Sequence, residues 1–250
     1  MSDQPLPPVR VTRQWPDRRR CWEYDTWGSH GRPVVFIPAI LFGRTSWWAV
    51  AADLRLHATV IAVDLPGHGN SARRQTYEPH LLVDELAALI ADLRIPQAPV
   101  IVAHGPSATL AELFASRYAA HAVVTVDAEP DPPVDRPGYL QHMQPASVPR
   151  QYRSLATPTD DGCLLHAYRG CLQRDTASTT RVAANHQRLA IHSSPPAARL
   201  RPAAPDGRLI VYDVPGRFPQ LSAVDRFTAD IRSVLRPRNP SAPARPEPGH

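Results

Sequence analysis

The sequence predicts an α/β domain in which a mostly parallel central sheet is covered by helices on both faces. Two observations support this fold class. Short runs of apolar, often β-branched residues recur along the chain, and they alternate with segments whose apolar residues follow helical spacing. Strands that alternate with helices in this way are typical of parallel sheets that are buried on both sides.

The elements can be assigned in chain order. Apolar strands are predicted at residues 33–38, 59–64, 99–103, 122–127, 188–192 and 208–212. Helices are predicted at about residues 78–93, 109–118, 162–174 and 225–235. The first of these helices has apolar residues on one face, namely Leu82, Leu86, Leu89, Ile90 and Leu93. At 250 residues the chain is long enough for one such domain with a small insertion.

Three turns after these strands resemble turns of the α/β-hydrolase family. The most specific is residues 64–71, which read D-x-P-G-H-G-x-S. Residues 103–108 (A-H-G-P-S-A) fall on the family's nucleophile elbow, G-H-S-x-G-G, and residues 214–221 (V-P-G-R-F-P-Q-L) resemble the turn that carries its histidine. The resemblance covers roughly four fifths of the chain, from about Trp22 to Leu235, and implies an α/β-hydrolase fold with a small lid insertion.

The catalytic positions depart from the family pattern. Gly105 falls where the resemblance places the nucleophilic serine, and glycine has no oxygen with which to attack. Pro106 follows it, and proline lacks the backbone N–H that forms half of the family's oxyanion hole. Arg217 stands where the general-base histidine is expected, and arginine stays protonated. No carboxylate follows the strand at 188–192, so the triad is predicted to be degenerate.

Other groups remain as candidates for chemistry. If the elbow lies two residues later, Ser107 is the nucleophile; in the favoured register it caps the next helix. His104, His192 and Asp127 come at strand ends, so an Asp127–His192 or Asp127–His104 pair is a candidate general base. Arg217 offers a fixed positive charge for a carboxylate or an enolate.

The substrate pocket is expected under a lid at about residues 129–185. Its expected lining joins the elbow, the loop after the first predicted strand and the lid: Ile40, Phe42, Trp47, Gly105, Pro106, Tyr139, His142 and Met143. Residues 1–21 are interpreted as an N-terminal extension, residues 22–235 as the domain, and residues 236–250 as a disordered tail rich in proline, alanine and arginine.

Composition narrows the classes of function. All 28 basic residues are arginine, which excludes chemistry based on lysine. The net charge is +5, but the arginines are scattered, so no nucleic-acid partner is expected. No signal peptide, membrane span or metal-ligand spacing is evident, and three well-separated cysteines indicate reduced thiols. A cytoplasmic protein without a cofactor or metal, acting on a small molecule, is expected; the oligomeric state stays open.

Three functions are carried forward from the sequence. The first is a tailoring enzyme of a natural-product-like pathway that uses non-covalent chemistry, such as elimination, cyclisation or another lyase-type step. The second is a non-catalytic pseudoenzyme that binds a ligand. The third is an esterase whose nucleophile is Ser107. Inference from this fold to a reaction is by analogy, because the same fold supports many chemistries.

Overall fold

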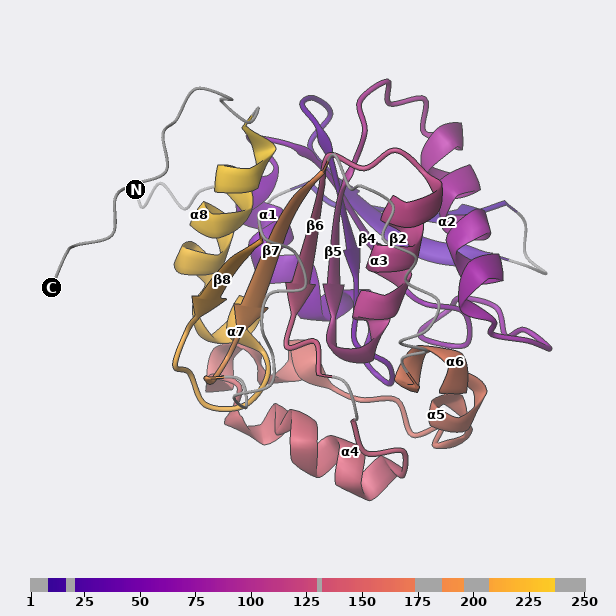
Figure 1. The fold of residues 1–250 in the computed structure, drawn as a ribbon, viewed down its shortest axis with the longest axis vertical. Coiled ribbons are helices and arrows are strands. Elements are labelled where there is room, and N and C mark those ends of the chain that lie inside the picture. Colours follow the sequence, from indigo (N-terminus) through magenta and orange to yellow (C-terminus); the bar gives the residue numbers. More distant parts are fainter. Residues whose placement is uncertain (1–8, 17–20, 130–131, 174–185, 196–206, 237–250) are drawn as a thin grey trace, which may run out of the picture.

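The computed structural model describes residues 9–16, 21–129, 132–173, 186–195 and 207–236. Its centre is one eight-stranded sheet with the order β1-β2-β4-β3-β5-β6-β7-β8 (Figure 1). The β1–β2 and β2–β4 pairs are antiparallel and the other five pairs are parallel, as predicted for most of the sheet. The strands are β1 (Val11–Trp15), β2 (Trp22–Trp27), β3 (Pro33–Ile37), β4 (Thr59–Val63), β5 (Val100–His104), β6 (Ala122–Val126), β7 (Gln187–His192) and β8 (Arg208–Val211).

Helices cover both faces of this sheet, which confirms the predicted fold class. Helices α2 (Pro79–Asp92) and α3 (Ala108–Arg117) lie on one face, and α1 (Trp48–Leu54) and α8 (Val224–Leu235) lie on the other (Figure 1). Shorter helices connect them: η1 (Arg44–Trp47), η2 (Gly105–Ser107), α4 (Arg136–Met143), η3 (Pro145–Ser147), η4 (Arg150–Ala156), α5 (Cys163–Ala167), α6 (Arg169–Leu172) and α7 (Pro219–Ser222).

The two faces of the sheet bury two separate apolar clusters, because side chains alternate along each strand. Ile101 and Ala103 of β5 point into the cluster beneath α2 and α3, whereas Val100 and Val102 point into the cluster beneath α1 and α8. All five residues of β5 are buried. This strand therefore holds the elbow at the centre of the sheet.

The N-terminal part of the sheet was not predicted. Residues 1–21 were expected as an extension, yet β1 within them pairs with β2 along its whole length, from Val11↔Thr26 to Trp15↔Trp22. Within the expected lid, the single helix predicted at 162–174 forms two short helices, α5 and α6, with a break at Tyr168. Residues 174–185 of the expected lid and 237–250 of the expected tail lie outside the described residues.

A cluster of buried charges joins β2 to the loop after β3. The Arg44 guanidinium contacts carboxylates of Glu23 (2.5 Å), Asp25 (3.0 Å) and Asp64. The side chain of Asp25 is fully buried, and those of Glu23 and Asp64 are nearly so. The Arg44 guanidinium is therefore the central cation for three carboxylates. The backbone N–H of Arg44 also donates to Asp64 (2.7 Å).

No helix in the described part of the chain is both long enough and apolar enough to cross a membrane.

Candidate functional site

The elbow turn places Gly105 at its tip. Strand β5 ends at His104, and the turn η2 leads directly into α3. Gly105 has φ +58°, a left-handed conformation that is strained for residues with a side chain. A Cβ built there would lie 3.6 Å from Ala39 Cβ and 3.7 Å from Tyr139 Oη, which are ordinary contacts. The backbone thus has the geometry expected of a nucleophile elbow, with no side chain at its tip.

Ser107 lies past the tip, in helical conformation (φ −65°, ψ −10°). Its buried hydroxyl donates a hydrogen bond to the Pro38 carbonyl oxygen at 2.7 Å. Ser107 stands at the N-cap position of α3, as predicted, but its hydroxyl makes no cap hydrogen bond and binds the loop after β3 instead. Pro106, which lies between Gly105 and Ser107, has no backbone N–H to donate.

We expect replacement of Ser107 by alanine to lower the free energy of unfolding by about 1–2 kcal/mol, because the buried Pro38 carbonyl loses its donor. Urea denaturation at pH 7 measures this change. The matched control is Ser116→Ala, which removes an exposed hydroxyl that donates to the Leu113 carbonyl. Equal stability of the wild-type protein and Ser107→Ala would contradict a structural role for this hydroxyl.

Tyr139 faces the tip from the covering helix α4. Asp135 caps this helix by accepting from the Gly138 N–H at 2.8 Å, and Gln144, with φ +50°, ends it. Figure 1 shows α4 lying across the carboxyl ends of the central strands. The Tyr139 side chain is fully buried and its hydroxyl has no hydrogen-bond partner among the described residues. Burial raises the pKa of the phenol above its ordinary value, so it stays protonated at neutral pH.

Arg217 occupies the loop after β8, at the expected base position. Its NH1 donates to Glu129 Oε1 (2.5 Å), and its Nε donates to the His142 carbonyl (3.1 Å). The backbone N–H of Arg217 donates to the Met143 carbonyl (3.2 Å). The guanidinium that was expected to bind an anionic substrate is therefore engaged by Glu129 and by the end of α4.

Glu129 also faces His142, with Oε2 3.5 Å from Nε2. Burial lowers the pKa of His142, and the Arg217 charge lowers it further, against the carboxylates of Glu129 and Asp127. The imidazole is therefore neutral at pH 7 and can accept a proton. Tyr139 and His142 are three residues apart on α4, so they lie on the same face of the helix. The sequence identified His142 as a pocket residue but not this histidine–carboxylate pair.

Asp127 and His192 lie at neighbouring strand ends, as expected from the parallel register. Asp127 has φ +45°, and both of its carboxylate oxygens accept hydrogen bonds from Ser193, from the backbone N–H (2.8 Å) and the hydroxyl (2.7 Å). Ser193 was not predicted as a partner of Asp127. His192, at the end of β7, is 6% exposed, and its backbone carbonyl accepts from the Tyr212 N–H.

His104 does not form the expected pair with Asp127. Its ring lies edge-on to Trp47 and Phe218, with centroid distances of 6.1 Å and 5.1 Å. Its Nδ1 is 3.3 Å from Gln220 Nε2, and its Nε2 has no hydrogen-bond partner among the described residues. Burial lowers the pKa of His104 to about 4, against the opposing charge of Asp127. The ring therefore packs beneath the elbow as a neutral group.

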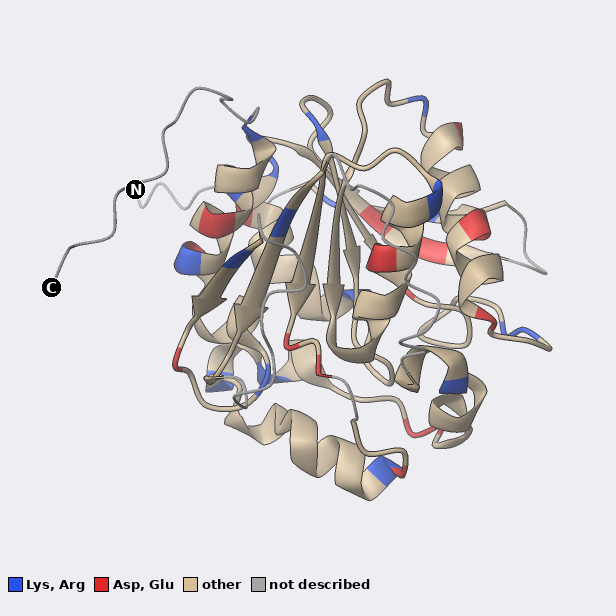
Figure 2. Cartoon of the chain, in the orientation of Figure 1, with Lys and Arg blue, Asp and Glu red and all other residues tan. Residues whose placement is uncertain are grey.

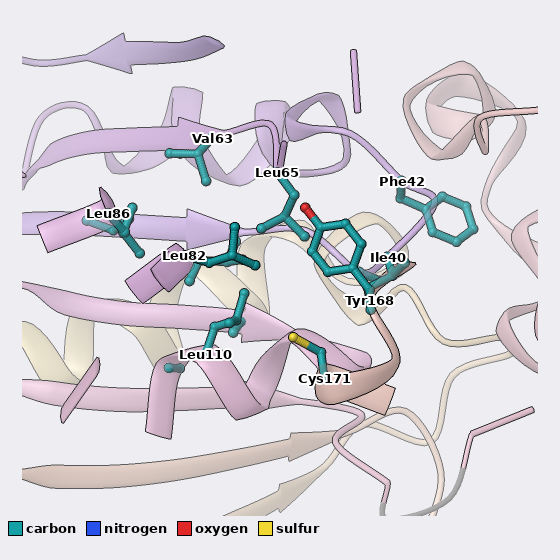
Figure 3. Close-up of a cluster of buried hydrophobic side chains, with 14 of the residues drawn as sticks. Ile40, Phe42, Val63, Leu65, Leu82, Leu86, Leu110, Tyr168 and Cys171 are labelled. Atoms are coloured by element: carbon teal, nitrogen blue, oxygen red, sulfur yellow. The ribbon is translucent and has the colours of Figure 1, made fainter. Parts of the chain in front are cut away.

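The remaining expected pocket residues pack against one another. Phe42 meets Phe218 edge-on at 4.9 Å, and Met143 is also buried. Figure 3 shows Ile40 and Phe42 within one cluster of buried side chains, with Ile40 close to Tyr168. Trp47 lies in the opposite cluster and stacks on Phe36 at 4.6 Å. Ile40, Phe42, Trp47, Tyr139 and Met143 are each at most 1% exposed, so their lining of a substrate pocket under the lid stays a prediction.

Among the described residues, no group of three histidine, cysteine, aspartate or glutamate side chains is placed to hold a metal ion. Figure 2 shows acidic and basic residues intermixed along the helices and loops in that view. Two sets of polar groups lie on or beside α4: the phenol of Tyr139, which faces Gly105, and the Arg217–Glu129–His142 cluster.

The fold and the elbow define an α/β-hydrolase. The sequence profile of the alpha/beta hydrolase family matches residues 34–245, and the chain belongs to this family. No curated protein matches the sequence.

Solved structures show the same fold at low identity. A thermophilic esterase from Thermogutta terrifontis, with malate bound, is 19% identical with a TM-score of 0.70, over 91% of this chain and 98% of that one. AqDC, studied for recognition and ring-cleavage of the Pseudomonas quinolone signal, is 14% identical with a TM-score of 0.72, over 89% and 99%. An E-2-(acetamidomethylene)succinate hydrolase is 19% identical with a TM-score of 0.67, over 91% and 99%.

Proposed function

We propose that this protein is a small-molecule tailoring enzyme that uses its α/β-hydrolase scaffold for non-covalent chemistry. The reaction is an elimination, a cyclisation or another lyase-type step of a natural-product-like pathway, and not hydrolysis through an acyl-enzyme. The observation that carries the proposal is the buried hydroxyl of Tyr139, which has no hydrogen-bond partner in the described part of the chain and faces Gly105 at the tip of the elbow. A phenol that is held protonated there supplies a hydrogen-bond donor where the family supplies a nucleophile.

The proposed hydrogen-bond donor is Tyr139. An unpaired polar group in a dry interior costs about 1–3 kcal/mol, so an oxygen atom of a bound molecule that accepted its proton would remove this penalty. Such an acceptor is a carbonyl or a leaving-group oxygen on which negative charge develops. The hydrogen bond strengthens as that charge grows, and this differential strength lowers the barrier.

The proposed base is His142, oriented by Glu129. Burial and the Arg217 charge keep the imidazole neutral, so it can accept a proton from carbon, and the Glu129 carboxylate stabilises the imidazolium that results. A hydrogen-bond donor and a base three residues apart on α4 suit an elimination or a ring closure. The position of AqDC among the structural neighbours, with its ring-cleavage reaction, supports a scaffold that serves reactions other than ester hydrolysis.

A non-catalytic, ligand-binding pseudoenzyme is the second candidate. The observation that favours it is the packing of the site, in which Tyr139, Phe42 and Met143 are at most 1% exposed. A substrate reaches Gly105 only if these side chains move. A protein that binds its ligand elsewhere, or that binds without converting it, needs no such movement.

An esterase that uses Ser107 is the third candidate, and the esterases among the structural neighbours support testing it. It requires the Ser107 hydroxyl to leave the Pro38 carbonyl and to reach a histidine. The bond at 2.7 Å and the helical conformation of Ser107 weigh against this arrangement.

One experiment separates the three functions. The purified protein is treated with a fluorophosphonate probe, and separately with a pool of apolar aromatic and β-hydroxy ketones, followed by mass spectrometry. We expect no covalent labelling, and depletion of at least one ketone whose rate falls about 10²–10⁴-fold in Tyr139→Phe, which removes the proton donor but keeps the ring. The matched control is Tyr118→Phe, which removes an exposed hydroxyl that donates to Asp84.

The other outcomes overturn the proposal or one part of it. Labelling that is lost in Ser107→Ala identifies the esterase and overturns the proposal. Ketones that raise the melting temperature but are never consumed identify the ligand-binding pseudoenzyme. Turnover that Tyr139→Phe leaves unchanged overturns the role of this phenol, even if the reaction class is correct.

A further inference from the structure

Arg217 connects three parts of the chain that meet above the elbow. It belongs to the loop after β8, it pairs with Glu129 beyond the end of β6, and it donates to two carbonyls at the end of α4. The His142 and Met143 carbonyls lie in the last turn of α4, where carbonyl groups lack helical partners. A cation is favoured at this end of a helix. Arg217 therefore stabilises both the end of α4 and its position on the sheet.

The neighbouring backbone fits against the same place. Gly216 has φ +71°, and a Cβ built on it would lie only 3.0 Å from both the Gln144 carbonyl oxygen and Ser147 Cβ. The loop after β8 and the chain that leaves α4 are thus in direct contact, and a side chain at position 216 would separate them. This close approach holds Arg217 at the distance its three hydrogen bonds require.

The covering helix lies above a filled space. Tyr139 and Met143 project from α4 into the buried cluster, and the Tyr139 hydroxyl comes within 3.7 Å of a Cβ built on Gly105. The other end of α4 is held at the surface, where Arg136 donates to the Thr159 carbonyl (3.1 Å) and to the exposed Asp160. The Arg217 contacts are therefore the more buried of the two attachments, with the Arg217 side chain 19% exposed.

We infer that Arg217, Glu129 and the carbonyls of His142 and Met143 form a latch that keeps α4 closed over Gly105, and that the site opens when this latch is released. Arginine at this position then has a mechanical role in place of the proton transfer that a histidine would perform. Its planar fork suits the role, because one guanidinium can bind a carboxylate and a carbonyl at the same time. The inference concerns access to the elbow and holds whichever molecule enters.

The alkylation rate of a cysteine thiol placed at the tip of the elbow measures this opening. Gly105→Cys is made in a Cys163→Ser background, which removes the exposed cysteine and leaves only the buried Cys21 and Cys171. The new Cβ has room, and its left-handed backbone costs about 1–2 kcal/mol. The rate of alkylation by N-ethylmaleimide is followed by intact-protein mass spectrometry. We expect slow alkylation in this background, and alkylation at least tenfold faster after Arg217→Met or Glu129→Gln.

The matched control is Arg188→Met. Arg188 pairs with Glu112 at 2.6 Å and has similar exposure, but it lies on β7 away from α4, so its loss should leave the alkylation rate unchanged. Equal rates with and without Arg217 overturn the latch, as does equal acceleration by Arg188→Met. Because alkylation needs no substrate, its result is independent of whether the proposed reaction exists.

Hydrogen exchange gives a second test that does not depend on the introduced thiol. In the otherwise wild-type protein, Arg217→Met should accelerate exchange at the amides of α4 at least tenfold, while β5 and α3 keep their protection. Unchanged exchange in α4 overturns the latch. Uniform acceleration over the whole domain also overturns it, because it reports lost global stability and not a local opening.

Discussion

Replacement of Arg44 by methionine should lower the free energy of unfolding by about 3–5 kcal/mol, the range observed when one partner of a buried ion pair is removed. Its guanidinium is the cation that faces Glu23, Asp25 and Asp64 at close range, and all three carboxylates are buried. Methionine keeps much of the volume but removes this cation from Glu23 and Asp64, and leaves Asp25 with Arg10 Nε at 3.8 Å. Urea denaturation at pH 7 measures the change.

Two comparisons make this prediction specific. Arg117→Met removes a pair with Asp84 in which both side chains are about 40% exposed, and we expect a loss of no more than about 1 kcal/mol. Burial already raises the pKa of Asp64, against the attraction of Arg44. Without Arg44 the Asp64 carboxylate protonates more readily in the folded state, so the deficit of Arg44→Met should be smaller at pH 5 than at pH 8. A deficit that does not depend on pH would contradict this electrostatic origin.

Acid should destabilise the protein through two buried histidines. Burial lowers the pKa of His68 and of His104 to about 4, whereas an unfolded histidine titrates near pH 6.5. Because their pKa is lower in the folded state, these two histidines bind protons in the unfolded state but not in the folded state as the pH falls from about 6.5 to about 4. Each histidine should therefore remove about 3 kcal/mol of stability over this window, at about 1.4 kcal/mol per pH unit.

Urea denaturation between pH 7 and pH 4 gives the number of protons taken up on unfolding, which should approach two near pH 5 from these two residues. His68 accepts the Leu41 N–H through Nε2 (2.9 Å), a bond that a glutamine oxygen can replace. His68→Gln should therefore lower the proton uptake near pH 5 by about one. His57→Gln, which changes an exposed histidine, is the control and should leave it unchanged. Equal uptake in wild-type and His68→Gln would show that His68 titrates normally.

The central strands and long helices could be predicted from sequence because burial on both faces requires continuous apolar runs. Strand β5, with all five residues buried, is the clearest example. The N-terminal strands escaped prediction for opposite reasons. Four of the five residues of β1 are exposed, so it has little apolar signal. Strand β2 is buried yet contains Glu23 and Asp25, whose burial depends on the Arg44 guanidinium. Arg44 lies about twenty residues later, so the residues around β2 do not indicate this ion pair.

The candidate site was predictable only where backbone geometry follows from local sequence. Gly105 at a positive φ is such a case, because a strand, a glycine and a following helix specify the turn. The partners of the side chains were not predictable in this way. Ser107 binds Pro38, Asp127 binds Ser193, and Tyr139 reaches Gly105 from a helix more than thirty residues later. These contacts depend on how distant segments pack.

The positive φ at the elbow has a consequence for the balance between stability and activity. In an enzyme that keeps a serine at this tip, the left-handed backbone is a permanent burden of about 1–2 kcal/mol, which persists because catalysis requires it. Glycine adopts φ +58° without that strain. This chain therefore keeps the turn without the backbone strain. Replacement of Gly105 by serine would restore that strain and lower the stability of the folded state. It would also gain little, since Pro106 and Arg217 would still withhold the oxyanion donor and the base.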